Sequence, residues 1–82
     1  MTYKIQSSKE FESDFRKVDS TLQKQIKKKF LEVAENPERY KHLHPPLQKY
    51  CRIWIGKLRI LFSYSVEEKI IYLEKIIVGH RY

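Results

Sequence analysis

Residues 51–62 read CRIWIGKLRILF, and this stretch decides the fold. Two alternating runs flank Gly56-Lys57, which predicts a β-hairpin with a two-residue turn, and glycine at the first turn position favours type II′. Ile55 then pairs with Leu58, and one face of both strands is wholly apolar and must be the core. The other pairs on that face are Ile53 with Ile60 and Cys51 with Phe62.

The opposite face of the hairpin carries two arginines and a tryptophan. The same register places Trp54 opposite Arg59, with Arg52 two residues before Trp54. A one-residue slip would bury both arginines, so the pattern strongly favours this register. Guanidinium groups suit phosphate and an aromatic face can stack a base, which indicates an anion site. The alternative is that arginine beside an aromatic ring serves only solubility and stacking.

Before the hairpin, the pattern predicts a short strand and two helices. Residues 2–6 alternate as in a strand, and Ser7-Ser8 offers an N-cap for the first helix. The second helix is expected over residues 21–35, because the residue before Pro37 avoids the helical region. Both helices have an apolar stripe. The stripes are Phe11, Phe15 and Val18 in the first helix, and Leu22, Ile26, Phe30 and Val33 in the second.

The rest of the chain is read as a loop and three strands. Residues 37–48 are expected to form a long loop, and strands are expected over residues 50–55, 58–66 and 69–78. If the turn at Glu67-Glu68 also has two residues, Lys75 falls on the core side, which predicts a β-bulge there. The order β-α-α-β-β-β gives an α+β fold, with two helices on one face of a mainly antiparallel sheet.

Length and charge limit the classes of function. The 82 residues predict one domain spanning residues 1–82, and 41% apolar content is enough for one core. With 17 Lys and Arg against 10 Asp and Glu, the net charge of +7 points to nucleic acid, an anionic membrane or an acidic protein as partner. The sequence has one cysteine and no long apolar run, so we expect a soluble protein in a reducing compartment, the cytoplasm.

Residues 51–62 resemble the hairpin motif Y-R-[IV]-x-[IV]-G-x-[YL]-R-[IV]-[IL]-[YF] of the RelE/ParE toxin superfamily. Residues 76–81, IIVGHR, resemble its V-G-[HK]-R ending, and the element order, length and basic charge are also similar. The resemblance covers essentially the whole chain and implies the toxin of a type II toxin–antitoxin pair. In the RelE branch such a toxin cuts mRNA in the ribosomal A site without a metal.

Two alternatives to a ribosome-dependent mRNA endoribonuclease stay open. Members of the ParE branch inhibit DNA gyrase and lack the catalytic set, and some family members have lost their toxicity. Carried over by position, the resemblance assigns the phosphate-binding role of the ribonucleases to Arg52, Arg59 and Arg81. Trp54 stands where some ribonuclease members have a basic residue, and Cys51 stands where tyrosine is common. Trp54 is a candidate for stacking an RNA base.

Proton transfer needs a group other than arginine, which stays protonated. The candidates are His80, with an ordinary pKa of about 6.5, and Tyr82, which serves only if cations lower its pKa from about 10. Gly79 is expected to end the last strand and let this tail turn toward the open face. The alternative for both residues is a bystander role at the end of the chain.

Further RNA contacts are expected from the loop and from the second helix. His42 and His44 lack a third ligand at metal-binding spacing, so we expect RNA binding and no metal or other cofactor. Lys24 and Lys28 belong to a basic helix that either contacts ribosomal RNA or is merely solvated. The expected partners are mRNA, the ribosome and an acidic, partly disordered antitoxin, with no membrane.

Overall fold

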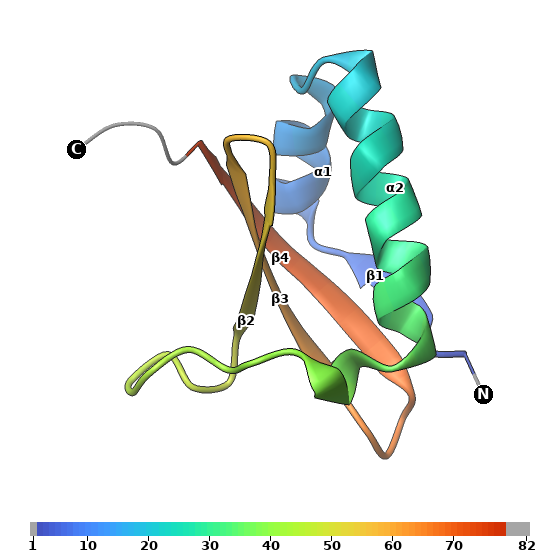
Figure 1. Cartoon of the computed structure of the whole chain (residues 1–82), viewed down its shortest axis with the longest axis vertical. Helices are drawn as coiled ribbons and strands as arrows, with labels where there is room; N and C mark the ends of the chain where they lie inside the picture. The colour runs from blue at the N-terminus through green and yellow to red at the C-terminus, as the bar shows by residue number, and fades with distance from the viewer. Residues whose placement is uncertain (1, 79–82) are drawn as a thin grey trace.

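The computed structural model describes residues 2–78 and contains four strands, two α-helices and one short 3-10 helix (Figure 1). The predicted order of strands and helices is confirmed, and the observed ends lie within two residues of the expected ones. The 3-10 helix lies inside the segment predicted as loop. In chain order the elements are β1 (Lys4–Ser7), α1 (Lys9–Arg16), α2 (Ser20–Glu35), η1 (Pro37–Arg39), β2 (Cys51–Ile55), β3 (Leu58–Ser65) and β4 (Ile70–Val78).

The strands form one sheet in the order β1-β4-β3-β2. Strands β2, β3 and β4 make an antiparallel meander, and β1 pairs in parallel with β4 at the other edge. Both α-helices lie between β1 and β2 in the chain and pack on the same face of the sheet (Figure 1). The predicted α+β fold is therefore confirmed. In residues 2–78, neither α-helix has the length and apolar character needed to span a membrane.

The β2–β3 hairpin has the predicted register. Ile55 pairs with Leu58, Ile53 with Ile60 and Cys51 with Phe62. Gly56 has a φ of +59°, whereas Lys57 is not in the positive-φ region. This combination is the one that a type II′ turn requires, and it matches the right-handed twist of the two strands.

The helices begin where the sequence supplies side-chain caps. Ser8 Oγ accepts a hydrogen bond of 2.9 Å from the Phe11 N–H at the start of α1. Asp19 does the same for α2, accepting from the Thr21 N–H at 2.9 Å. Each cap satisfies a backbone donor that has no partner within the helix.

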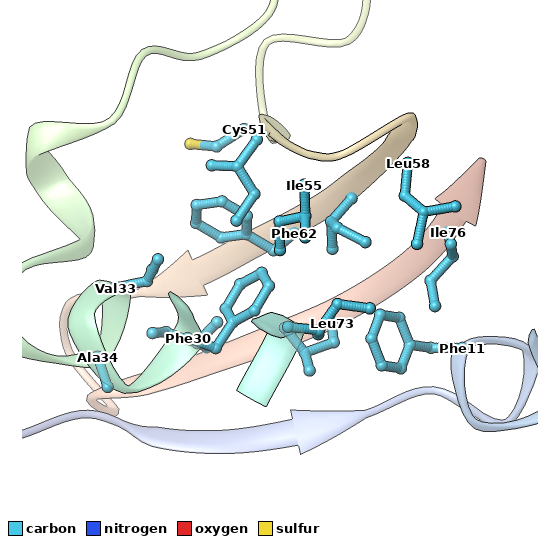
Figure 2. Packing of buried hydrophobic residues seen from close by; sticks show 14 of the residues in the cluster. Phe11, Phe30, Val33, Ala34, Cys51, Ile55, Leu58, Phe62, Leu73 and Ile76 are labelled. Atoms are coloured by element: carbon cyan, nitrogen blue, oxygen red, sulfur yellow. The ribbon is translucent and has the colours of Figure 1, made fainter. Parts of the chain in front are cut away.

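The core lies between the two helices and the apolar face of the sheet (Figure 2). Phe30 of α2 packs edge-on against Phe62 of β3, with ring centroids 5.4 Å apart. Buried residues recur at every second position of β2, at positions 51, 53 and 55, as the alternation predicts. Val18 follows the end of α1 and still packs against this core.

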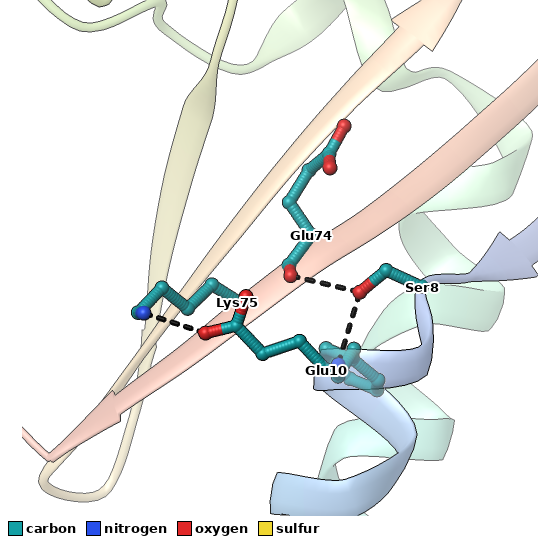
Figure 3. A network of polar contacts seen from close by, with 5 residues as sticks. Ser8, Glu10, Glu74 and Lys75 are labelled. Carbon is teal, nitrogen blue, oxygen red and sulfur yellow. Dashed lines mark hydrogen bonds and ion pairs between the residues drawn. The ribbon is translucent and has the colours of Figure 1, made fainter.

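The predicted β-bulge is present in β4. Leu61 pairs with Lys75 and Phe62 pairs with Leu73, so Glu74 is the extra residue. The bulge keeps Lys75 out of the core: its side chain is exposed, and Nζ lies 2.6 Å from Glu10 Oε2 of α1 (Figure 3). Ser8 Oγ also donates to the Glu74 carbonyl at 3.0 Å, so two polar contacts attach α1 to the bulge.

Candidate nucleic-acid interface

The face of the hairpin that points away from the helices carries the predicted arginines and tryptophan. Trp54 pairs with Arg59 across the two strands, and Arg52 pairs with Leu61. Because the neighbours of these residues along each strand are buried in the core, the three side chains share the open face. The structure therefore brings together three of the predicted site residues.

Both guanidinium groups lie against the indole ring. The Cζ atoms of Arg52 and Arg59 are 6.0 and 5.6 Å from the Trp54 ring centroid. Arg52 is exposed, Arg59 is half-buried, and Trp54 is 51% exposed. Two permanent positive charges thus flank an aromatic surface of which about half is open to solvent.

A groove runs between this open face and the long loop. Its walls are loop residues 41–44 on one side and Arg52 and Trp54 of β2 on the other, and its volume is about 310 Å³. His42 pairs with Cys51 in an isolated antiparallel bridge, which holds the loop alongside β2. The two predicted loop histidines therefore lie at the same site as the hairpin residues.

The His42 ring is held on both sides. Its Nδ1 lies 3.7 Å from Cys51 Sγ, and its Nε2 lies 3.2 Å from the Tyr64 hydroxyl. Burial raises the pKa of the Cys51 thiol, so it stays protonated at neutral pH. Burial also raises the pKa of Tyr64, and the nearby Cys51 and Glu38 raise it further. Both histidines are exposed on the groove wall, and His42 is the one whose ring is held by these side-chain contacts.

The structure separates the helix lysines from this interface. Lys24 and Lys28 are exposed on α2, which covers the opposite face of the sheet (Figure 1). They therefore lie on a different surface from Arg52. Any role in RNA binding would involve a second, separate surface.

His80, Arg81 and Tyr82 lie outside the described residues, as does the predicted strand end at Gly79. Strand β4 ends at Val78, which pairs with Leu58 beside the hairpin turn. Within residues 2–78, no three His, Cys, Asp or Glu side chains are grouped so as to hold a metal ion.

Sequence reasoning missed two residues of this region. Lys41 lines the groove, and Tyr64 supports the His42 ring from the helix side of β3. The charge of Lys41, next to His42 in the sequence, was a usable signal. No such signal existed for Tyr64, because a contact across 22 residues depends on how the loop folds back.

A small basic α+β domain, with two helices on one face of a four-stranded sheet, has the architecture of the small toxins of the RelE/ParE superfamily. Residues 5–81 match the model of the ParE toxin of the type II toxin–antitoxin system parDE. Because this match spans nearly the whole chain, the protein belongs to the ParE toxin family. The sequence matches none of the curated proteins with which it was compared.

Solved structures with the same fold come from RelE proteins. A chain of the RelBE2 toxin–antitoxin complex from Mycobacterium tuberculosis has a TM-score of 0.85 at 18% identity, covering 99% of this chain and 100% of that chain. The isolated E. coli RelE toxin gives 0.82 at 24% identity, with 98% and 87% covered. A chain of the archaeal RelE–RelB complex from Pyrococcus horikoshii OT3 gives 0.80 at 17% identity, covering 100% of both chains. The fold is therefore RelE-like.

Proposed function

We propose that this toxin is a ribosome-dependent mRNA endoribonuclease that acts without a metal. The observation that supports the proposal is the open-face cluster, in which Arg52 and Arg59 lie within 6.0 Å of the exposed Trp54 ring. Two fixed positive charges beside a stacking surface suit a single-stranded polyanion. The proposed action on ribosomes would take place in the cytoplasm, where we propose the protein is located.

The reaction starts with the RNA 2′-hydroxyl, which attacks the adjacent phosphorus as its proton passes to a base. The bond from phosphorus to the 5′-oxygen breaks, that oxygen receives a proton, and a 2′,3′-cyclic phosphate remains. Arg52 and Arg59, together with Arg81, neutralise the charge that develops on the phosphate. His80 or Tyr82 transfers the protons, because arginine does not release one at neutral pH.

Gyrase inhibition without an active site is the second candidate function. Two observations favour it: the family match is to the ParE toxin, and Trp54 occupies a position that is basic in some of the ribonucleases that the hairpin resembles. In this alternative the arginine–tryptophan cluster binds a partner protein and performs no chemistry.

One experiment separates the two candidates. Expression of the toxin is induced in cells, a reporter mRNA is mapped by primer extension, and chromosomal breaks are measured in the same cultures. Cuts within codons that disappear in Arg59→Ala cells support the endoribonuclease. Intact mRNA together with accumulating double-strand DNA breaks supports the gyrase inhibitor and overturns the first proposal.

The partner that restrains the toxin is proposed to be an acidic antitoxin. The net charge of +7 favours such a partner, and four of the similar structures are complexes of the toxin with its antitoxin or an antitoxin peptide. An apolar groove of about 420 Å³ between β1 and α2, lined by Ile5, Phe30 and Leu31 and bordered by Lys27, is a suitable surface for an amphipathic acidic segment. Co-expression of the toxin with the protein encoded by the neighbouring gene tests the proposed partner. If the toxin is harmless when expressed alone and co-purifies with no acidic protein, the proposed antitoxin is overturned.

A further inference from the structure

We propose that the toxin associates with a second copy of itself through the free edge of β1, with the groove between β1 and α2 at the centre of the contact. This surface is separate from the open face of the hairpin, so the proposal does not depend on whether the protein cleaves RNA. Three observations carry it: an unpaired strand edge, an exposed apolar pair beside that edge, and charges placed so that two copies complement each other.

Strand β1 has a free edge. In the part of the chain that the structure describes, β4 is the only strand that pairs with it. The Lys4 N–H donates to the Lys69 carbonyl on the β4 side at 2.8 Å, and backbone groups alternate sides along a strand, so those of Ile5 point away from β4. The Tyr3 N–H agrees with this alternation, because it donates to the Ala34 carbonyl of α2 at 2.9 Å. An edge with unpaired backbone groups is a template for another strand.

The groove beside this edge presents apolar side chains to solvent. Its volume is about 420 Å³, and Ile5, Phe30 and Leu31 are among the residues that line it. Ile5 is 38% exposed, and Leu31, at 66%, is the most exposed large apolar side chain of the described residues. A leucine on the surface of a helix gains hydrophobic stabilisation only when another molecule covers it.

A two-fold axis at Ile5 accommodates both the strand edge and the helix. Antiparallel pairing of β1 with its copy places Ile5 opposite the partner's Ile5, and the two residues exchange both backbone hydrogen bonds. The axis is then perpendicular to the joined sheet, so both copies of α2 lie on one face of it and run antiparallel. Because Leu31 lines the same groove as Ile5, it lies beside the axis and meets the partner's Leu31.

The charges along α2 fit this arrangement. Lys27 and Glu35 lie four residues before and after Leu31, on the same side of the helix, and Lys27 also lines the groove. In two antiparallel helices that meet at Leu31, Lys27 of each copy therefore faces the partner's Glu35. Glu35 is held near β1, because its Oε2 accepts a hydrogen bond of 3.1 Å from Thr2 Oγ1. The two ion pairs across the axis offset part of the repulsion between chains that each carry a net charge of +7.

Self-association and antitoxin binding then exclude each other, because the antitoxin is proposed to occupy the same groove. The open face stays accessible in the dimer, since the two sheets join edge to edge. The contact consists of one short strand and one side of a helix, and interfaces of this small size give weak, concentration-dependent dimers.

Sedimentation equilibrium of the purified toxin, over about a hundredfold range of concentration, measures the association. We expect monomer and dimer with no larger species, because each chain has one such edge. Leu31→Glu should weaken dimerisation by about tenfold or more, and the matched control Leu47→Glu, at an exposed site in the long loop, by less than about twofold. Lys27→Glu and Glu35→Lys should each weaken it about three- to tenfold. The double variant exchanges the signs of both pairs and should recover most of the parent's affinity.

Three results would overturn the proposed dimer: a toxin that is monomeric at every concentration, equal dimerisation of Leu31→Glu and Leu47→Glu, or a double variant no stronger than the single ones. A monomeric toxin whose Leu31→Glu variant loses a co-purifying acidic protein would assign the groove to the antitoxin alone, and would also overturn the dimer. None of these results depends on mRNA cleavage, so the proposed endoribonuclease is tested separately.

Discussion

The two faces of the β2–β3 hairpin are built from neighbouring residues and have opposite properties. Cys51, Ile53 and Ile55 are at most 7% exposed, whereas Trp54 between them is 51% exposed. The backbone is common to both faces, so their difference comes from the side chains alone. One face therefore packs into the core, and the other carries the proposed binding site. Substitutions on adjacent residues should separate stability from activity.

The largest effect should come from the covered face. Phe62 is fully buried and packs against Phe30 and Tyr40, with ring centroids 5.4 and 6.1 Å away. Phe62→Ala should lower the free energy of unfolding by about 3–5 kcal/mol, because a large cavity replaces the ring. Urea denaturation measures this. Leu61→Ala, one residue earlier on the open face, is the control and should cost much less. Equal losses would show that the two faces do not differ as described.

On the open face, a substitution should mainly change the mRNA-cleaving activity rather than the stability of the fold. Arg59→Ala should reduce single-turnover cleavage of mRNA on programmed ribosomes by about 100- to 1,000-fold, as loss of one charge-stabilising contact typically does. The circular dichroism spectrum should stay that of the parent, because the side chain is only half-buried. Arg16→Ala on α1 removes the same charge from another surface and serves as the control. A toxin that is as active with Arg59→Ala as without it would exclude this cluster from catalysis.

Sequence alone predicted the hairpin well for a physical reason. Three features of the sequence required the same strand register. Apolar residues alternate with polar ones along both strands, the turn begins with a glycine suited to a left-handed position, and two arginines could not be buried. The bulge at Glu74 was predictable for a similar reason, since without it a lysine would have entered the core. These are local constraints, and each involves residues close together in a strand or a turn.

The groove wall could be predicted only in part. The sequence marked His42 and His44 as candidates, but the contact of His42 with Tyr64 depends on the path of residues 40–50, which no periodic pattern specifies. The separation of Lys24 and Lys28 from Arg52 likewise follows from the helices covering the opposite face. Whether Arg81, His80 and Tyr82 complete the site stays a prediction, because they lie outside the described residues.

A change of pH should have an intermediate effect on the free energy of unfolding, through the buried thiol of Cys51. Burial raises the pKa of the Cys51 thiol above its ordinary value of 9.0, so the unfolded chain releases this proton first. The stabilisation that the protonated thiol gives the folded state is complete below pH 9.0. It is lost as the pH rises toward the folded-state pKa, and the free energy of unfolding then falls by at most about 1.4 kcal/mol per pH unit. Denaturation between pH 8 and 10 should show this decline in the parent and a flatter one in Cys51→Ala. Parallel curves would mean that the thiol does not titrate differently on folding.

The smallest effect should come from the contact that joins the helices to the bulged strand. Ser8 Oγ accepts from the Phe11 N–H at 2.9 Å and donates to the Glu74 carbonyl at 3.0 Å, so one hydroxyl caps α1 and attaches it to β4 (Figure 3). Ser8→Ala should lower the free energy of unfolding by about 1 kcal/mol, the usual cost of a lost N-cap. Ser7→Ala, at the exposed end of β1, is the matched control and should change it by less than about 0.5 kcal/mol. Because the open face is not involved, single-turnover cleavage of mRNA should be the same in both variants. Slower cleavage in Ser8→Ala alone would show that the attachment of α1 also shapes the open face, and that the two faces are coupled through β4.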